Sequence, residues 1–358
     1  MQSNFMMRVA FFPKVEAYKD NPYWKLLESS LKEVGAELVN TNDKYYLQWQ
    51  WLLRNRNQIE ILHLHHLEPH YAADQHHASP KLFAKFIGKL LLARLLGYRI
   101  VWTLHNLSPH DPLEPIYVGR WTHLLVAQIA HVIIVHCEYA RKALKTEFHR
   151  SRNVYTIPHP NFICVYPNSV TKKQAKEALG LTDRQKVFLY FGAIRPYKGI
   201  ERLIEIFKEM PGENLALIIA GKTWNQEIGD SLMKSVGEDH RIHLILQYIP
   251  DESIQLYFNA ADVAVLPFSN VLSSGSALLA MSFGRPVVAP GIGCLTETLK
   301  NGAGILYDPS DLSGLRKALQ QSLTVDLDLL GKQAMQRIKE LTWRNTAQMT
   351  LQAYRAAF

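Results

Sequence analysis

The 358-residue sequence has few cysteines and no long apolar run. Its three cysteines, Cys137, Cys164 and Cys294, are widely separated, which excludes a disulfide-stapled secreted fold and the paired spacing of a zinc site. Sparse cysteine is typical of a reducing cytoplasm. No stretch of about 18 apolar residues is free of charge, so the sequence predicts no transmembrane helix. The first residues lack the organisation of a signal peptide, and we expect a cytoplasmic protein.

A nucleic-acid-binding motif is also absent. The formal net charge is +8 and the pI is near 9.2, which favours anionic partners such as nucleotides or acidic lipids. Without a motif, charge alone supports nucleic acid only weakly, and we expect no nucleic-acid partner. A chain of this length is long for one core, so we expect two domains.

The sequence alternates short apolar runs with amphipathic stretches in both halves. This alternation predicts an α/β fold with two parallel, doubly wound sheets. Pro160 and Pro167 interrupt the pattern. We therefore expect an N-terminal domain at 1–165, a C-terminal domain at 166–341 and a last helix at 342–358 that packs back on the first domain.

One stretch of the second half combines a buried strand with a basic loop. The run from Val187 to Phe191 is apolar and too short for a buried helix. Gly192 ends it, and the loop that follows carries Arg195 and Lys198 before a helix begins after Gly199. Ligands of open α/β sheets bind at this edge, and Arg and Lys are suited to phosphate oxygens. From these residues alone, a solvated basic loop remains equally open.

Several motifs occur in the order and spacing of one enzyme family. They are RPYKG at 195–199, AGK at 220–222, IPDE at 249–252, ADVAVLP at 261–267, AMSFGRPVVA at 280–289 and NGAGIL at 301–306. This set, which spans residues 195–306, resembles the GT-B glycosyltransferases of family 4. The first half matches more loosely, through HLH at 63–65 and TLHN at 103–106. The resemblance implies two Rossmann-like domains with a cleft between them.

The sequence departs from that family at two positions. The family has two glutamates spaced E-x7-E, whereas this chain has Val271 and Leu279 there. The roles of those glutamates cannot be carried over. Between the two positions lie Ser273, Ser274, Gly275 and Ser276, at the start of a predicted helix. Backbone N–H groups and hydroxyls there can hold a diphosphate, although simple helix capping remains open. The pattern is similar to an exopolysaccharide subgroup.

The resemblance implies a donor site and a metal-independent reaction. Arg195 and Lys198 would bind the diphosphate, with the segment 273–276 in support. Glu297 matches a family glutamate and would reach the donor sugar or base. A carboxylate at a helix N-terminus is the alternative for that residue. We expect no cofactor and no metal, because His63, His65 and His66 lack a spaced carboxylate pair or cysteine.

The acceptor chemistry points to residues after the predicted strand that ends near Leu104. His105 matches the histidine of the family's TxHD motif and can either donate a hydrogen bond or accept a proton. A structural histidine that ties a loop is the alternative. Asp111 is the candidate base for an inverting reaction, with Glu114 as a second choice, although a surface position suits both.

The stretch from Pro80 to Leu96 has a lysine stripe, Lys81, Lys85 and Lys89, opposite apolar residues. Such a helix suits an anionic membrane surface, and a core-packed helix with solvated lysines explains it equally well. We therefore expect a cytoplasmic protein, with peripheral binding to the inner leaflet of the cell membrane left open.

The sequence as a whole favours a nucleotide-sugar-dependent hexosyltransferase for exopolysaccharide biosynthesis. The subgroup suggests GDP-mannose as donor, with UDP-sugars as alternatives, and a lipid-linked sugar or polysaccharide as acceptor. Two other functions stay open. One is a sugar-nucleotide epimerase of the same fold, and the other is a non-catalytic GT-B module that binds nucleotide or glycan.

Overall fold

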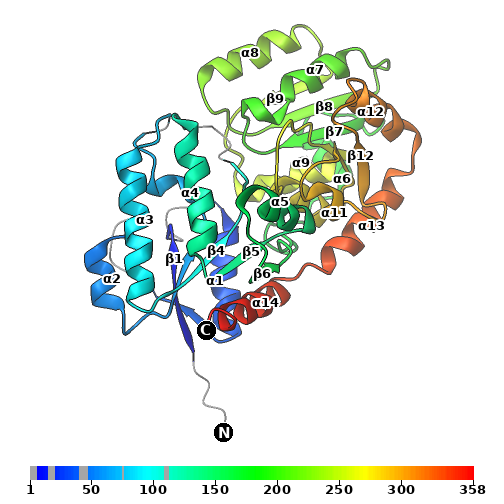
Figure 1. Ribbon diagram of the computed structural model, residues 1–358. Helices are drawn as coiled ribbons and strands as arrows, with labels where there is room; N and C mark the ends of the chain where they lie inside the picture. The colour runs from blue at the N-terminus through cyan, green and yellow to red at the C-terminus, as the bar shows by residue number, and fades with distance from the viewer. Residues whose placement is uncertain (1–5, 15–20, 40–46, 75, 109–112) are drawn as a thin grey trace. The chain divides into compact units, whose positions relative to one another are not determined.

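The computed structural model describes residues 6–14, 21–39, 47–74, 76–108 and 113–358. The chain divides into two compact units, of which unit 1 is Met1–Pro160 with Thr342–Phe358 and unit 2 is Asn161–Leu341. Each unit is built on one six-stranded sheet with helices around it (Figure 1). The predicted α/β class with two parallel, doubly wound sheets is confirmed.

The sheet of unit 1 has the strand order β2-β1-β3-β4-β5-β6, and all of its pairs are parallel. Its strands are β1 Met7–Phe12, β2 Ala36–Leu38, β3 Ile61–Leu64, β4 Arg99–Thr103, β5 Val132–Val135 and β6 Val154–Thr156. Its helices are α1 Pro22–Glu33, α2 Trp49–Asn55, α3 Pro80–Leu95, α4 Ile116–Ile129, α5 Glu138–Phe148 and α14 Trp343–Arg355. Helices α1 and α14 pack side by side, as do α3 and α4 (Figure 1).

The helices of unit 1 begin where local chemistry predicts. Asn21 accepts a hydrogen bond from the backbone N of Tyr23, and Pro22 occupies the first turn of α1, where its missing N–H costs nothing. Thr342 caps α14 in the same way. Leu351 and Tyr354 of α14 are buried in the core cluster that α1 and the sheet form. The last helix therefore completes unit 1.

The sheet of unit 2 has the order β12-β11-β10-β7-β8-β9 and is also parallel. Its strands are β7 Lys186–Phe191, β8 Leu215–Ala220, β9 Ile242–Ile245, β10 Val263–Val265, β11 Val287–Pro290 and β12 Gly304–Tyr307. Its helices are α6 Lys172–Ala178, α7 Ile200–Lys208, α8 Gln226–Val236, α9 Ile254–Ala260, α10 Gly275–Ser282, α11 Leu295–Thr298, α12 Gly314–Thr324 and α13 Leu327–Lys339. Strand β7 is central, and its residues from Val187 to Tyr190 are buried as the sequence predicts, whereas Phe191 is half-buried.

The boundary between the units lies five residues earlier than the sequence analysis placed it. Residues 161–165 belong to unit 2, not to the N-terminal domain. The backbone N of Asn161 donates to Leu341 O at 2.8 Å, and that of Phe162 donates to Ser282 Oγ at 3.0 Å. Phe162 also packs in the core of unit 2. The positions of the prolines could not predict these long-range hydrogen bonds, which fix the boundary.

Each sheet has one position where the strand order reverses, and ligands of such sheets bind at the carboxyl ends of the strands there. In unit 2 this switch point lies between β7 and β10, and in unit 1 it lies between β1 and β3. Each unit therefore has one edge at which a ligand site is expected. Within the described ranges, no helix combines the length and apolarity that a membrane crossing needs.

Candidate functional site

The basic loop of unit 2 lies at the switch point between β7 and β10. Gly199 has a φ of +68°, and a side-chain Cβ there would come within 2.2 Å of Pro267 O, just beyond β10. Only glycine allows so close an approach of the two segments. The loop is also tied to that segment because Ser269 N and Oγ both donate to Tyr197 O at 3.0 Å.

On its other side the loop pairs with the segment that follows β8. Ile194 N donates to Lys222 O at 2.9 Å, and Trp224 N donates to Ile194 O at 3.0 Å. This pairing places the indole of Trp224 beneath the guanidinium of Arg195, whose Cζ lies 4.0 Å from the ring centroid. A stacked guanidinium loses little further freedom when it binds an anion, so Arg195 is well oriented for a phosphate.

Lys198 is held over an aromatic ring in a similar way. Its Nζ lies 4.1 Å from the centroid of the Phe268 ring and 5.0 Å from that of Tyr197. Burial, and to a smaller extent the charge of Arg195, lower the pKa of Lys198 to about 8. The side chain therefore remains mostly protonated at pH 7. No described carboxylate forms an ion pair with Lys198, and a partly buried cation in such surroundings favours an anionic ligand.

The serine segment 273–276 meets the basic loop. Ser274 is the N-cap of α10 and accepts a hydrogen bond from Ala277 N at 3.2 Å, which is the capping role that the sequence left open. A Cβ on Gly192 would lie 3.0 Å from Ser276 Oγ, so the start of α10 adjoins the end of β7. Gly275 is exposed, with open space around its Cα. Capping by Ser274 leaves the other N–H groups of this helix end available to an anion.

Glu297 reaches the same edge from a third loop. Cys294 N donates to Leu272 O at 2.7 Å, so α11 begins beside the serine segment, and Glu297 lies half-buried in its first turn. Val271 and Leu279, at the positions of the family's two glutamates, are buried. The structure thus brings the predicted donor residues of unit 2 to one edge, with Glu297 as the carboxylate among them.

In unit 1, histidines follow four neighbouring strands at their carboxyl ends. His65 and His66 come directly after β3, and His105, His136 and His159 come shortly after β4, β5 and β6. His105 lies with its ring centroid 5.4 Å from that of His65, 5.0 Å from that of His66 and 5.3 Å from that of His136. Because they meet at one sheet edge, these side chains form a continuous imidazole cluster.

Hydrogen bonds give the members of this cluster different roles. His63, on β3 itself, has both ring nitrogens engaged at 2.7 Å, one by Tyr354 Oη and the other by Thr103 Oγ1. The Nδ1 of His136 lies 2.9 Å from Ile157 O, so it carries the proton and donates. The Nδ1 of His65 lies 3.1 Å from the Nε2 of His105. His63 is thus a structural residue, whereas His65 contacts the candidate catalytic side chain.

Burial makes the cluster neutral. Desolvation is the main cause that lowers the pKa of His105 well below 6.5, and the neighbouring His66, His136 and His159 lower it further. Desolvation and the neighbouring histidines lower the pKa of His65 in the same way. A neutral imidazole at pH 7 can donate from one nitrogen and accept at the other. This edge of unit 1 can therefore bind hydroxyl groups without bringing a charge.

Asp111, the predicted base, lies outside the described residues. Glu114 is exposed, and it accepts a hydrogen bond from Ile116 N at 3.3 Å at the start of α4. Among the residues that the structure describes, no group of three or more His, Cys, Asp or Glu has a geometry that could hold a metal ion.

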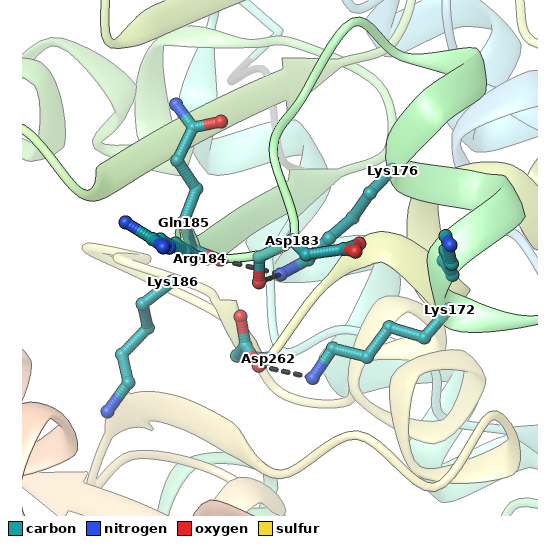
Figure 2. Close-up of a pocket in the computed structure, with 8 residues that line it drawn as sticks. Lys172, Lys176, Asp183, Arg184, Gln185, Lys186 and Asp262 are labelled. Atoms are coloured by element: carbon teal, nitrogen blue, oxygen red, sulfur yellow. Dashed lines mark hydrogen bonds and ion pairs between the residues drawn. The ribbon is translucent and has the colours of Figure 1, made fainter.

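One hollow in unit 2 lies away from the switch point. It has a volume of about 450 Å³ at the opposite edge of the sheet, near the starts of β7 and β10. Figure 2 shows that its inner cations already hold the fold together: Lys172 pairs with Asp262, and Lys176 donates to Asp183 O and Gln185 O. We therefore place the donor site at the basic loop and not in this hollow.

Sequence reasoning missed the residues that orient the predicted ones. Trp224 and Phe268 lie under the two cations, and His136 adjoins His105. For the aromatic residues no local signal exists, because they come from other loops. The histidines had a signal, since four neighbouring predicted strands of the first half are each followed by a histidine at the carboxyl end.

The second half of the chain is similar to a known family of enzymes. Residues 171–339 match the family of glycosyl transferases group 1. The chain is 26% identical over 335 residues to the GDP-mannose:glycolipid 4-beta-D-mannosyltransferase of Xanthomonas campestris pv. campestris, and the match covers 90% of this chain and 87% of that protein. It is 28% identical over 173 residues to the O-antigen chain mannosyltransferase B of Escherichia coli, covering 47% of this chain and 45% of that protein.

Solved structures share the fold over nearly the whole chain. Sucrose-phosphate synthase from Thermosynechococcus elongatus superposes with a TM-score of 0.76 at 19% identity, over 98% of both chains. HepE from Anabaena, solved in complex with UDP, gives a TM-score of 0.75 at 14% identity, over 98% of this chain and 100% of that one. The GT-B fold predicted from the sequence is confirmed.

Proposed function

We propose that this chain, whose residues 171–339 match the glycosyl transferases group 1, is a glycosyltransferase that transfers mannose from GDP-mannose to a lipid-linked or polysaccharide acceptor. The observation that carries this proposal is the pair of cations, Arg195 and Lys198, fixed over aromatic rings at the switch point of unit 2. Relatives named as a GDP-mannose:glycolipid mannosyltransferase and an O-antigen mannosyltransferase support the sugar and the acceptor class.

The reaction that we propose needs the charge of the departing diphosphate to be stabilised. Arg195 offers a planar fork and Lys198 a point charge, and the N-terminus of α10 adds backbone N–H groups. Glu297, a half-buried carboxylate in the first turn of α11, would accept hydrogen bonds from hydroxyls of the donor sugar. This arrangement would stabilise a leaving nucleoside diphosphate without a metal.

Thermal-shift measurements and a sugar-transfer assay test which nucleotide sugar is the donor. GDP and GDP-mannose should raise the unfolding midpoint more than UDP or ADP and their sugars, because a ligand that binds the native state stabilises it. Label from GDP-mannose should then appear in a lipid-linked acceptor. If UDP alone raised the unfolding midpoint, the donor would be a UDP-sugar and not GDP-mannose. Conversion of the donor to another nucleotide sugar without acceptor would instead establish an epimerase.

Removal of the lysine charge tests the diphosphate site. We expect Lys198→Ala to weaken GDP binding by about 1.5–3 kcal/mol, the scale of a hydrogen bond to a charged group. Guanosine should lose far less, because it carries no phosphate. Calorimetric titration of both ligands measures the difference. Lys173→Ala, an exposed lysine on α6 at the other edge of the sheet, is the matched control and should bind both ligands normally.

We propose that His105, which lies in unit 1, acts on the reacting groups of the substrates. We expect His105→Ala to lower kcat by roughly 100-fold, while the affinity for GDP changes little, since GDP binding is assigned to unit 2. Steady-state kinetics with saturating donor and a titration with GDP separate the two effects. An unchanged kcat would return His105 to a structural role.

Helix α3 is proposed to contact an anionic membrane surface. Lys81 and Lys85 are exposed, and helical spacing puts the exposed Leu91 and Leu95 on the same side. Lys89 is half-buried beside them, and burial and Lys85 lower its pKa. Lysines supply attraction to acidic headgroups, and the leucines supply apolar area.

Vesicle binding tests this contact. We expect binding to phosphatidylglycerol vesicles that fades as salt is added, because each lysine contributes about 1 kcal/mol that ions screen. Changing Lys81, Lys85 and Lys89 to Gln should remove most of the binding in a sedimentation assay. Changing three exposed lysines of unit 2 such as Lys173, Lys234 and Lys300 is the matched control. Equal binding to neutral vesicles would contradict an electrostatic contact.

A further inference from the structure

We propose that His65 is a positioning residue that fixes the tautomer of His105, so that His105 carries its proton on Nδ1 and meets the substrate as a hydrogen-bond donor. The proposal rests on the proposed function in one respect, namely that His105 acts on the reacting groups.

The backbone and the surroundings of His65 hold its ring in one orientation. His65 N donates to Phe12 O at 2.9 Å, which ties the residue to the switch point between β1 and β3. The ring is 2% exposed, and it packs against Phe11 at 4.7 Å, Trp24 at 4.6 Å and His63 at 4.0 Å between centroids. Because the ring is packed on several sides, it cannot rotate toward another hydrogen-bond partner.

The bond between the two histidines has only two arrangements when both rings are neutral. Either His65 Nδ1 carries a proton and donates to His105 Nε2, or His105 Nε2 donates to His65 Nδ1. The first arrangement puts the proton of His105 on Nδ1, and the second puts it on Nε2. One hydrogen bond therefore sets both tautomers together.

The far side of the His65 ring decides between the arrangements. Its Nε2 is buried, and no described residue offers it a hydrogen-bond partner. In the second arrangement this atom would bear an N–H group that donates to nothing, whereas in the first it bears only a lone pair. Buried N–H groups without an acceptor are rarer in proteins than buried acceptors without a donor. The first arrangement is favoured, and it leaves His105 with the proton on Nδ1.

A chemical consequence follows for the reaction. With Nε2 engaged as an acceptor from His65, the other ring nitrogen of His105 carries a hydrogen and has no lone pair with which to remove a proton. Deprotonation of the acceptor hydroxyl then belongs to another group. This distinguishes the two roles that the sequence left open for His105, donation and proton acceptance.

Nitrogen NMR of the full-length protein with ¹⁵N-labelled histidine tests the tautomer directly. We expect the Nδ1 of His105 to have the chemical shift of a protonated nitrogen and its Nε2 that of an unprotonated one, assigned with His105→Ala. A protonated Nε2 would overturn the proposal and leave a catalytic His105 intact. Conversely, an unchanged kcat in His105→Ala would overturn the proposed function of His105 and leave the tautomer assignment standing.

Three variants test the role of His65. His65→Leu removes the donor, and we expect the His105 signals to shift toward the other tautomer and kcat to fall by about 10- to 100-fold, with KM nearly unchanged. His65→Asn keeps an amide group near the Nδ1 position and should recover kcat to within a few-fold of the wild type. His65→Gln places its amide near the Nε2 position and should not. Equal kcat in the Asn and Gln variants would contradict a positioning role.

Discussion

A chain that ends after Leu341 is expected to lose the fold of unit 1 and all sugar transfer, while unit 2 remains folded. The truncation removes α14, whose Leu351 and Tyr354 are buried in the core of unit 1. Burial of two such side chains stabilises a protein by about 2 kcal/mol each, and the Tyr354 hydroxyl adds a hydrogen bond to His63 at 2.7 Å. Because proteins are stable by only about 5–15 kcal/mol, this loss is severe.

Hydrogen exchange resolved by mass spectrometry measures the two units separately. Peptides from residues 6–160 should exchange much faster in the truncated protein, and those from 161–341 should not. GDP should still raise the midpoint of unit 2, since Arg195, Lys198 and the serine segment lie within it. Tyr354→Phe is the graded control, because it removes only the hydroxyl bond to His63 and should cost about 1–3 kcal/mol. Truncated protein with full transfer activity would show that α14 is dispensable.

The sequence predicted most strands of both sheets because strands in a parallel sheet are buried on both faces and read as continuous apolar runs. The predicted strand from Val187 to Phe191, for example, is found as β7, Lys186–Phe191. Strand β2 and helix α2 were not predicted, since Ala36–Leu38 and Trp49–Asn55 are too short for a clear period.

Residue types at the candidate site could be predicted, whereas their environment could not. Arg195 and Lys198 are visible in the sequence because charge beside a strand end is a local signal. The rings beneath them come from Trp224 and Phe268, which only the strand order brings together. Similarly, HLH at 63–65 matched a family motif, but the different roles of His63 and His65 depend on Tyr354, almost 300 residues away.

Acidification is expected to unfold unit 1 before unit 2. Burial lowers the pKa of His63 to about 3. Burial also lowers the pKa of His70 and of His159 to about 3, with smaller contributions from Lys89 beside His70 and from His136 beside His159. The unfolded chain protonates its histidines near pH 6.5, so it binds more protons than the folded state between pH 6.5 and about 3. Stability is therefore complete above pH 6.5 and is lost progressively as the pH falls toward 3.

The expected loss is large because several histidines act together. Each contributes about 1.4 kcal/mol per pH unit, so these three alone cost roughly 4 kcal/mol per unit below pH 6.5. By about pH 5 the loss is comparable to the whole stability of a domain. Of the 15 histidines in the chain, only His240 and His243 lie between residues 161 and 341. Unit 2 should therefore keep most of its stability over the same range.

Urea unfolding at a series of pH values, followed by hydrogen exchange of each unit, measures both slopes. We expect the free energy of unfolding of unit 1 to fall steeply between pH 6.5 and 5, and that of unit 2 to change little. His63→Gln should reduce the slope of unit 1 by about 1.4 kcal/mol per pH unit, whatever it does to stability at neutral pH, since it removes one titrating ring. Parallel acid profiles for the two units would mean that the histidine cluster is protonated in the folded state. In that case the neutral imidazole pair on which the tautomer of His105 depends would exist only above the pH of that protonation.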